Sequence, residues 1–463
     1  MRILLSDGSG LTARQCATRL AAGGHIVEVL APDPLCLCRF TRHVARLHRV
    51  PAYGPDPVSW LAAALEIYRS GPFEVLFPTQ EQVAVLSWAE HQLDAAGVHT
   101  AVPPFAAVLA VQDKISASAT LRRLGIPQPE TAATGEGWDR FPAYVKDPIG
   151  TASGGVRRVS SPAELQQAAG AAPVLVQAAA IGPLLMCQSV FNHGSLVAFH
   201  ANERTAEGAG GGASHKRSVS VPDVRQFFEV LGSDLEWHGA LSADVIFSRD
   251  GPMFIDVNPR LVEPQNAYAS GVDLVGSMLE LATGGDPAPL QEGKPDVATH
   301  QLLLAVLGAA QHGRGRCGVL AELLHAARNT ADYRSSTEEL TPLAGDLRTV
   351  VPLAMATAAT LLRPTSWSWF ASGSVSGYAL SAQGWHQILE ADPARDLRPR
   401  ARQARSQRSS RTAALMAIQR GLESTRHDRL APRPNPPRHR GCIRLHRRPR
   451  FSGPGHRPHE ADR

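Results

Sequence analysis

The first hundred residues alternate between short apolar runs and stretches with apolar positions every three to four residues. The apolar runs predict strands, and the spaced stretches predict amphipathic helices. Strands are expected at residues 2–6, 25–30, 74–78 and 98–102, with helices ending at residue 22 and spanning residues 58–70 and 81–96. This order predicts an α/β layer that opens with a Rossmann-like β-α-β unit.

The turn after the first predicted strand is rich in glycine. Gly8, Gly10 and Ala13 fit the loose form of a dinucleotide-binding fingerprint, with Asp33 beyond the second strand. The same residues suit a turn that merely leads into a helix, and we favour this second interpretation.

Residues 113–282 mix strands and helices in a different order. Asp113 and Lys114 open a predicted helix that ends at Gly125, and residues 141–147 form a predicted strand that carries Lys146. Further strands are expected at residues 173–177, 186–192 and 195–200, and helices at residues 162–169 and 224–231 and up to residue 282. From residue 300 to residue 389 the pattern is mainly helical.

Residues 239–260 predict a β-hairpin with Arg249-Asp250-Gly251 as a three-residue loop. Such a loop brings three pairs of residues opposite each other: Ser248 and Pro252, Ile246 and Phe254, and Asp244 and Asp256. The last pair places one carboxylate directly across from another.

Side chains along the second strand of this hairpin should alternate between two faces. One face would carry Asp256 and Asn258, and the other Met253, Ile255 and Val257. Two opposed carboxylates repel unless a cation lies between them, and carboxylate and amide oxygens suit Mg²⁺. An ordinary hairpin with polar residues facing water is the alternative, but it gives no reason for an acid opposite an acid.

Charge is unevenly distributed along the 463 residues. The formal net charge is +5, yet residues 391–463 alone carry 19 arginines against 6 acidic residues. The first 390 residues hold 28 basic and 36 acidic side chains, so the expected folded part is mildly acidic. On charge grounds this part is no nucleic-acid binder.

The segment 392–463 is rich in arginine and proline and has few large apolar residues. Such a segment cannot bury enough apolar surface to order itself, so we expect a disordered appendage. Out-of-frame translation is a second explanation for its composition. Binding of nucleic acid or acidic lipid through its arginines is an alternative, and its histidines match no common metal-site spacing.

Lysine is scarce in this arginine-rich chain. Arginine occurs 43 times, and the four lysines are Lys114, Lys146, Lys216 and Lys294. A lysine that persists where arginine serves nearly every other cationic position marks a place that wants a compact ammonium, although we read Lys294 as a surface residue. Lys146 precedes the small-residue loop 150–156, which could cradle a phosphate, and a flexible surface loop is the alternative.

No apolar stretch is long enough to span a bilayer or to form the core of a signal peptide. The six cysteines form no CxxC pair and no zinc spacing. These features predict a reduced, cytoplasmic compartment.

Several of these motifs follow one another in a recognisable order. They are Asp113-Lys114, Gly125-Ile126-Pro127, Lys146 with Gly154-Gly155, Val176-Gln177, Trp237-His238-Gly239, Asp244 and Ile255-Asp256-Val257-Asn258-Pro259-Arg260. The order resembles the ATP-grasp superfamily, in the group of carboxylate–amine ligases that includes enzymes like carbamoyl-phosphate synthase and biotin carboxylase. The resemblance covers about residues 1–290, and its most specific part is the Asp-x-Asn-Pro-Arg run.

The resemblance implies an organisation in four parts. These are a Rossmann-like preATP-grasp domain at residues 1–108, an ATP-grasp domain at 109–290, a mainly helical region at 291–391 and the tail at 392–463. Residues 336–385 resemble the C-terminal region of actinobacterial-type ATP-grasp proteins, from which no activity follows.

The resemblance also implies a set of site residues, with ATP and Mg²⁺ (or Mn²⁺) as cofactors. The implied ATP contacts are Lys114, Lys146, Thr151, Ser153, Gly154, Gly155, Val176, Gln177 and Ala178. The implied metal ligands are Asp244, Asp256 and Asn258. Arg260 would hold the substrate carboxylate or acyl phosphate, and Arg204 and Arg217, beside a glycine run, are further catalytic candidates.

The implied reaction transfers the γ-phosphoryl group of ATP to a carboxylate, and an amine or similar nucleophile then displaces phosphate. The expected partners are these small molecules, with no membrane and no nucleic acid, and a homodimer is left open. Ala178 and Pro183 stand where the family commonly carries acids. A nucleotide-binding but non-catalytic module, acting as a sensor or scaffold, is therefore the alternative, and a nucleic-acid binder acting through the tail ranks below it.

Overall fold

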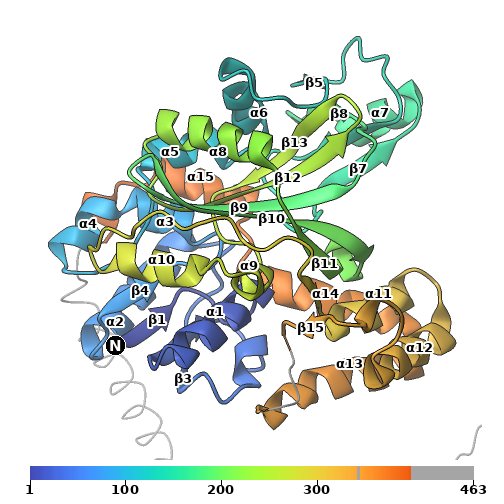
Figure 1. Cartoon of the computed structure of the whole chain (residues 1–463). Coiled ribbons are helices and arrows are strands. Elements are labelled where there is room, and N and C mark those ends of the chain that lie inside the picture. The colour runs from blue at the N-terminus through green and yellow to red at the C-terminus, as the bar shows by residue number, and fades with distance from the viewer. Residues whose placement is uncertain (171, 341–344, 398–463) are drawn as a thin grey trace, which may run out of the picture. The chain divides into compact units, whose positions relative to one another are not determined.

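Three β-sheets organise the described part of the protein (Figure 1). The computed structural model describes residues 1–170, 172–340 and 345–397. Nearly all of the predicted tail lies outside these residues, and so do the predictions that it is disordered or binds nucleic acid. Met1–Arg398 form one compact unit. This mixture of sheets and helices confirms the predicted α/β fold class.

The N-terminal sheet is parallel, with the strand order β3-β2-β1-β4. Its strands are β1 (Arg2–Leu5), β2 (Ile26–Ala31), β3 (Arg46–Arg49) and β4 (Val75–Phe77). The helices of this region are α1 (Leu11–Ala22), α2 (Pro57–Ser70), α3 (Val83–Trp88), α4 (Glu90–Ala95) and α5 (Phe105–Val111), with a 3₁₀ turn η1 at Leu37–Arg39. Parallel strands joined by helices confirm the Rossmann-like opening.

Three details of this region differ from the sequence-based expectation. The helix predicted at residues 81–96 is divided at Ala89, where φ is −103°. No strand forms at residues 98–102, where the Leu76 amide donates to the His99 carbonyl at 2.9 Å without continuing into a ladder. The edge strand β3 was not expected, because its sequence is mostly polar.

A seven-stranded sheet with the order β13-β12-β9-β10-β11-β14-β15 forms the centre of the unit. Its strands are β9 (Leu184–Asn192), β10 (Ser195–Glu207), β11 (Ala213–Val219), β12 (Gly239–Ser248), β13 (Gly251–Asn258), β14 (Ala298–His300) and β15 (Thr337–Glu338). All neighbours are antiparallel except β14 and β15. The predicted domain boundaries stay predictions, and this sheet includes two strands from beyond residue 290.

The two faces of this sheet differ in chemistry. Helix α8 (Pro222–Asp234) covers one face, where Val224, Phe228 and Leu231 pack into an apolar core. Helices α9 (Gln265–Ser270) and α10 (Leu274–Ala282) lie on the other side (Figure 1). Beyond α10, that second face becomes polar: one cross-strand row holds Ser242, Gln188 and His200, and the next holds Asp244 and Asn202. We call it the polar face.

The β12–β13 hairpin departs from the predicted register. Arg249 and Asp250 alone form the loop, and Gly251, with φ of +110°, already belongs to β13. The observed pairs are Ser248 with Gly251, Ile246 with Met253, and Asp244 with Asp256. The pairs Ser248–Pro252 and Ile246–Phe254 were therefore wrong, because a two-residue loop forms where three residues were expected.

A β-bulge then restores the pairing of the two acids. Asp244 faces Asp256 while Val245 faces Phe254, so Ile255 is the extra residue of β13. The bulge also shifts the alternation of side chains, and Phe254 and Val257 both pack under α8. The prediction that Val257 shares a face with Met253 and Ile255 was therefore wrong, whereas Asp256 and Asn258 share the polar face as predicted.

A small antiparallel sheet, β5-β8-β6-β7, stands beside the large one. Its strands are β5 (Thr131–Ala132), β6 (Ala143–Lys146), β7 (Val156–Val159) and β8 (Leu175–Ala178), with helices α6 (Lys114–Arg123) and α7 (Pro162–Ala169). Asp113 caps α6 by accepting the amides of Ile115 and Ser116, both at 2.9 Å. This cap confirms the predicted helix start and fixes where Lys114 lies.

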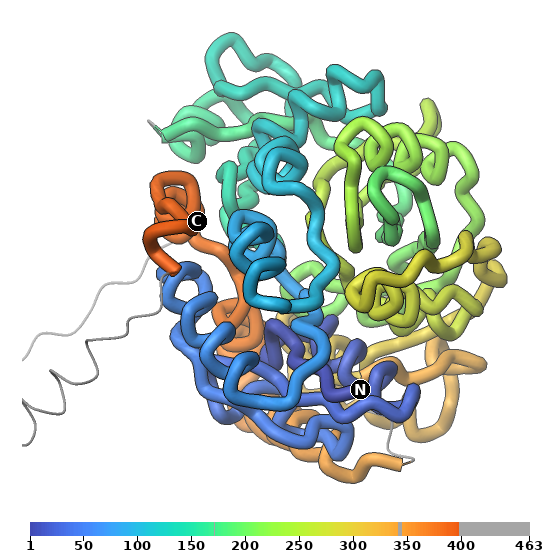
Figure 2. The backbone as a smooth tube through the Cα atoms, turned by 90° about the vertical axis from the view of Figure 1, so that its left-hand side faces the viewer, coloured from blue at the N-terminus to red at the C-terminus, as the bar shows by residue number. Residues whose placement is uncertain are grey.

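The region after β14 is mainly helical, as predicted. It contains α11 (Leu302–Gln311), α12 (Gly315–Arg328), α13 (Val350–Leu362), α14 (Trp367–Ser376), α15 (Ala382–Glu390) and α16 (Pro393–Asp396), with 3₁₀ turns η3 (Ala331–Tyr333), η4 (Leu347–Thr349) and η5 (Pro364–Ser366). Helix α15 returns to the N-terminal region (Figure 2), where Gln387 donates to Asp56 at 3.0 Å. No helix of the described residues is long and apolar enough to cross a membrane.

Candidate functional site

Two carboxylates face each other at the edge of the polar face, on the hairpin β12–β13. Asp244 and Asp256 are direct cross-strand partners. Burial, together with the negative charge of Asp256, raises the pKa of Asp244 to about 6, while Lys146, Arg260 and Arg204 act in the opposite direction. The arrangement favours a bound cation, because like charges this close destabilise the sheet.

Two of the four lysines reach the same place, Lys146 from strand β6 of the small sheet and Lys114 from the start of helix α6. Lys146, at 6% exposure, donates to the side chain of Gln177 at 2.8 Å and to the carbonyl of Ile255 at 2.6 Å. Lys114 donates to the carbonyl of Gly150 at 2.8 Å, and its ammonium lies 3.7 Å from Asp256. Burial and the nearby charge of Lys114 lower the pKa of Lys146, although both aspartates oppose this shift. The structure therefore brings the predicted phosphate-directed lysines to the predicted metal ligands.

The small-residue loop between β6 and β7 closes tightly on itself. Thr151 donates its hydroxyl to Glu81, and the Gly154 amide donates to the carbonyl of Thr151 at 2.9 Å. Gly155 has φ of +75°, and a Cβ there would lie 2.5 Å from the carboxylate of Asp147. Only glycine fits this position without strain. Ser153, with φ of +63°, also takes the left-handed conformation within this loop.

Asp147, which follows Lys146 directly, is paired with an arginine. Its carboxylate accepts from the guanidinium of Arg157 at 2.6 Å. The paired arginine balances an acid that would otherwise lower affinity for an anion.

The strand predicted to contact adenine is β8. Val176 and Gln177 are buried, and the side chain of Gln177 is engaged by Lys146. The amide of Ala178 donates to the carbonyl of Glu130 at 2.9 Å. If the backbone of Ala178 binds an adenine base, it must therefore use its carbonyl group or exchange the amide's hydrogen bond to Glu130 for one to the base.

Arg260 follows β13 and turns toward the N-terminal region. It is 9% exposed, and among the described residues its Nε atom has no hydrogen-bond partner. The same atom lies 4.0 Å from Glu81, and the guanidinium carbon lies 6.0 Å from the ring centre of Tyr378. The Arg260 amide donates to the carbonyl of Asn258 at 2.8 Å. A buried guanidinium with a free donor is suited to bind an anion.

The other two predicted arginines lie on opposite faces of the sheet. Arg204 continues the polar-face side of β10, and its guanidinium donates to the carbonyl of Gly211 at 2.7 Å. Arg217 follows Lys216 on β11 and so points to the α8 side, where it is exposed and lies 3.7 Å from Glu203. The structure therefore gathers Arg260 and Arg204 but not Arg217.

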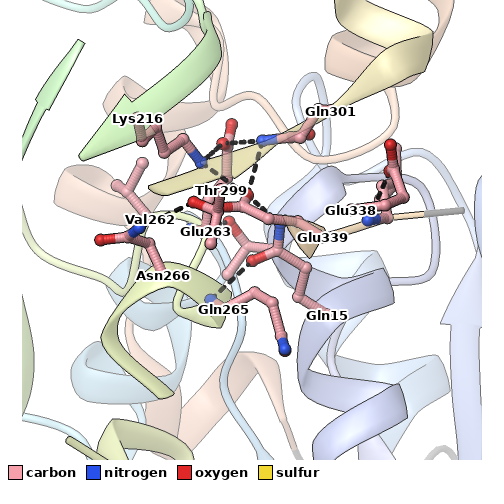
Figure 3. Close-up of polar contacts among 12 residues, drawn as sticks. Gln15, Lys216, Val262, Glu263, Gln265, Asn266, Thr299, Gln301, Glu338 and Glu339 are labelled. Carbon is pink, nitrogen blue, oxygen red and sulfur yellow. Dashed lines mark hydrogen bonds and ion pairs between the residues drawn. The ribbon is translucent and has the colours of Figure 1, made fainter. Parts of the chain in front are cut away.

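One group of buried polar residues was not among the site residues predicted from the sequence. Lys216 lies on the polar face, and its ammonium contacts the carboxylates of Glu263 and, at 2.8 Å, Glu339 (Figure 3). The amides of Gln15 and Gln301 also donate to Glu339, at 3.1 and 3.0 Å, and Thr299 donates at 2.6 Å. We call these residues the buried glutamate cluster: Gln15, Lys216, Glu263, Thr299, Gln301 and Glu339.

The charges of this cluster sit deep in the protein. The side chain of Lys216 is 2% exposed, that of Glu339 is 0% exposed, and that of Glu263 keeps 13% exposure. Burial alone would lower the pKa of Lys216, but the two carboxylates outweigh it and the pKa is raised. Lys216 therefore stays an ammonium. The scarcity of lysine could have pointed to it, although nothing local in the sequence points to its partners.

Two amides of the glycine-rich turn at the N-terminus are engaged by a side chain of the same turn. The carboxylate of Asp7 accepts the amides of Ser9 and Gly10 at 2.9 and 2.7 Å. The ring of Tyr378 would be 3.1 Å from a Cβ on Gly10. The turn leads directly into α1, which begins at Leu11.

No group of three or more His, Cys, Asp or Glu residues suited to a metal ion occurs within residues 1–170, 172–340 and 345–397. A metal at Asp244 and Asp256 would thus take its further ligands from Asn258, from water or from a bound phosphate. Mg²⁺ accepts such a mixed set, with few protein carboxylates.

Residues 111–264 match the ATP-grasp domain family. No curated protein matches the sequence significantly.

Solved structures share the fold at low identity. The biotin carboxylase domain of Hydrogenobacter thermophilus 2-oxoglutarate carboxylase, in complex with MgADP, ADP and bicarbonate, is 14% identical, with a TM-score of 0.50 over 64% of this chain and 73% of that one. Carboxyaminoimidazole ribonucleotide synthase from Aspergillus clavatus, complexed with ATP, is 16% identical, with a TM-score of 0.52 over 65% and 81%. At these identities the likeness concerns the fold.

Proposed function

We propose that this chain, whose residues 111–264 match the ATP-grasp domain family, is an ATP- and Mg²⁺-dependent ligase that activates a carboxylate for attack by an amine or similar nucleophile. The observation that carries the proposal is the convergence of Lys114 and Lys146 on the opposed pair Asp244 and Asp256. Phosphoryl transfer needs positioning and charge neutralisation, and these four side chains supply both signs of charge at one place.

In this proposal the metal ligands are Asp244, Asp256 and Asn258, which lie on the same face of the hairpin. Bound Mg²⁺ would neutralise phosphate oxygens and fix their orientation. The raised pKa of Asp244 fits this role, since a cation replaces the proton that the opposed acids favour.

The remaining residues divide between nucleotide and substrate. Lys114 and Lys146 hold phosphate oxygens, the loop containing Thr151, Ser153, Gly154 and Gly155 covers them, and the strand Val176, Gln177, Ala178 lies beside the base. Arg260 binds the substrate carboxylate through its free donor, and Arg204 supports the transferred group. Lys216 is the cross-strand partner of Arg204, and Glu263 follows Arg260 by three residues, so in this proposal the buried glutamate cluster lies on the substrate side.

A nucleotide-binding but non-catalytic module is the second candidate. Ala178 and Pro183 offer no acid to a ribose, and the Ala178 amide is already bonded to Glu130. Such a module would bind Mg·ATP without releasing ADP. Under both candidates we keep a cytoplasmic location and small-molecule partners in the proposal, and the homodimer remains open.

Isothermal titration with Mg·ATP tests the nucleotide site first. We expect wild-type protein to bind, and Asp256→Ala to bind at least about tenfold more weakly because one of two metal carboxylates is lost. Asp250→Ala is the matched control, since it removes an exposed acid from the loop of the same hairpin. Undiminished binding by Asp256→Ala would remove the basis of the proposal.

Turnover is tested separately, by ADP release across a panel of carboxylic acids combined with amines. ADP release that requires both an acid and an amine supports the ligase. Tight Mg·ATP binding with no ADP release across the panel favours the non-catalytic module instead.

A further inference from the structure

Away from the candidate nucleotide site, arginines from three separate segments line one cavity. The cavity has a volume of about 320 Å³, and its charged lining consists of Arg39 in η1, Arg46 in β3 and Arg348 in η4. A second hollow of about 500 Å³ shares Arg348 and adds Arg42. Four arginines therefore line two spaces that share Arg348, at the β3 edge of the N-terminal sheet.

Counter-charge is nearly absent at these arginines. No acid lines the first cavity, and Asp346 lines the second. The carboxylate of Asp346 is turned inward, where it accepts from the hydroxyl of Thr41 at 2.5 Å and from the amide of Arg42 at 2.9 Å. Within the described part of the chain, Arg39, Arg42, Arg46 and Arg348 form no ion pair.

A fifth arginine lies buried behind them. Arg14 is 2% exposed, and its Nη2 atom has no hydrogen-bond partner among the described residues. Its nearest acid is again Asp346, at 3.6 Å, which is beyond hydrogen-bond length. Asp346 is thus the one acid among the residues that line the two spaces, in a folded part that carries more acidic than basic residues.

Arg39, Arg42, Arg46 and Arg348 are all exposed, so water screens their mutual repulsion and leaves their guanidinium groups accessible to an anion from solution. The planar fork of a guanidinium matches the oxygens of a phosphate and binds them in pairs. A space of 320 Å³ lies at the small end of the range for small-molecule sites. We propose that this cavity binds a phosphorylated small molecule, at a site distinct from that for ATP.

The proposed site shares no lining residue with the candidate ATP site. Its lining comes from η1, the β3 strand and η4, whereas the nucleotide candidates come from α6, the small sheet and the β12–β13 hairpin. Occupancy of one site is therefore measurable with the other disabled, and failure of this inference would leave the proposed ligase untouched.

Isothermal titration with inorganic pyrophosphate, at fixed ionic strength, tests the inference. We expect the wild-type protein and Lys146→Met, which impairs the ATP site, to bind equally well. Arg46→Gln/Arg348→Gln should bind at least about tenfold more weakly, because each arginine contributes charge-assisted hydrogen bonds. Arg225→Gln, at a partly exposed arginine on α8, controls for the loss of a positive charge elsewhere.

Each outcome decides the matter. Loss of binding in the double variant, with binding kept by Lys146→Met and Arg225→Gln, supports the site. Absence of binding by wild type, binding that survives the double variant, or binding lost only in Lys146→Met would overturn it. Succinate that binds as tightly as pyrophosphate would overturn the phosphate assignment. The single variant Arg39→Gln should also weaken pyrophosphate binding. Thermal melting of each variant checks that the variant is folded.

Discussion

We expect the ionised side chain of Asp244 to lower the stability of the metal-free protein and to contribute to Mg·ATP binding. Its carboxylate is buried opposite Asp256, and both effects raise its pKa from 3.8 to about 6. Replacing it with asparagine keeps the shape of the side chain and removes the charge. We therefore predict that Asp244→Asn stabilises the metal-free protein at high pH while it weakens Mg·ATP binding.

The size of the effect follows from the two pKa values of Asp244. A pKa that is higher in the folded state than in the unfolded state means that ionisation opposes folding: the penalty begins above pH 3.8 and is complete above about pH 6. The rise from 3.8 to about 6 corresponds to about 3 kcal/mol of lost stability at pH 8. The penalty falls to about 1.5 kcal/mol at pH 5 and disappears below pH 3.8, where both states are protonated.

Urea unfolding at pH 8 and pH 5, with EDTA present, measures this difference directly. Asp244→Asn should unfold at higher urea than wild type at pH 8, with roughly half that gain in free energy at pH 5. Asp250→Asn, in the exposed loop of the same hairpin, should show neither the gain nor its pH dependence. A variant that is no more stable than wild type at pH 8, or whose difference does not change with pH, would refute the reasoning.

Three further outcomes are expected. Lys216→Met should destabilise the protein by about 3–5 kcal/mol in urea unfolding, since it leaves Glu339 buried without its cation. Adding Glu339→Leu should recover part of the loss, whereas a cost below about 1 kcal/mol for Lys216→Met would mean that the pair is not buried in solution. Arg217→Ala should leave Mg·ATP binding and ADP release unchanged while Arg204→Ala lowers ADP release, and the reverse pattern would contradict the assignment of faces. Gly155→Ala should lower thermal stability by about 1–2 kcal/mol through its positive φ and its contact with Asp147, with Gly137→Ala as a control for positive φ alone, and equal losses in both variants would discount that contact.

The opposed acids could be predicted from sequence because two errors compensated. The expected loop had one residue too many, which displaced the pairs near the turn. The bulge at Ile255 then inserted one residue into β13 and returned Asp256 to its place opposite Asp244. Period-two alternation identifies a strand well but cannot locate a bulge, since a bulge depends on packing under α8 rather than on local composition.

The orientation of β11 was beyond sequence reasoning for a different reason. Lys216 and Arg217 are neighbours, and the strand must send one to each face. Composition alone cannot say which of the two reaches the polar face. Only the register with β10, which pairs Lys216 with Arg204, decides it. The short strand β3 escaped for lack of apolar alternation, because an edge strand next to solvent needs none.

The buried glutamate cluster joins residues inside the family match to residues outside it. The match to the ATP-grasp family ends at residue 264, directly after Glu263. Glu339, the acid that shares Lys216 with Glu263, lies 123 residues beyond that lysine and arrives next to strand β15. Its side chain is fully enclosed by groups from α1, β11 and β14, so the helical C-terminal region completes the polar face instead of merely packing against it. In the proposed site, the nucleotide residues and Arg260 therefore lie within the part matched to the family. The cluster that the proposal places beside the substrate takes Gln15, Thr299, Gln301 and Glu339 from outside that match.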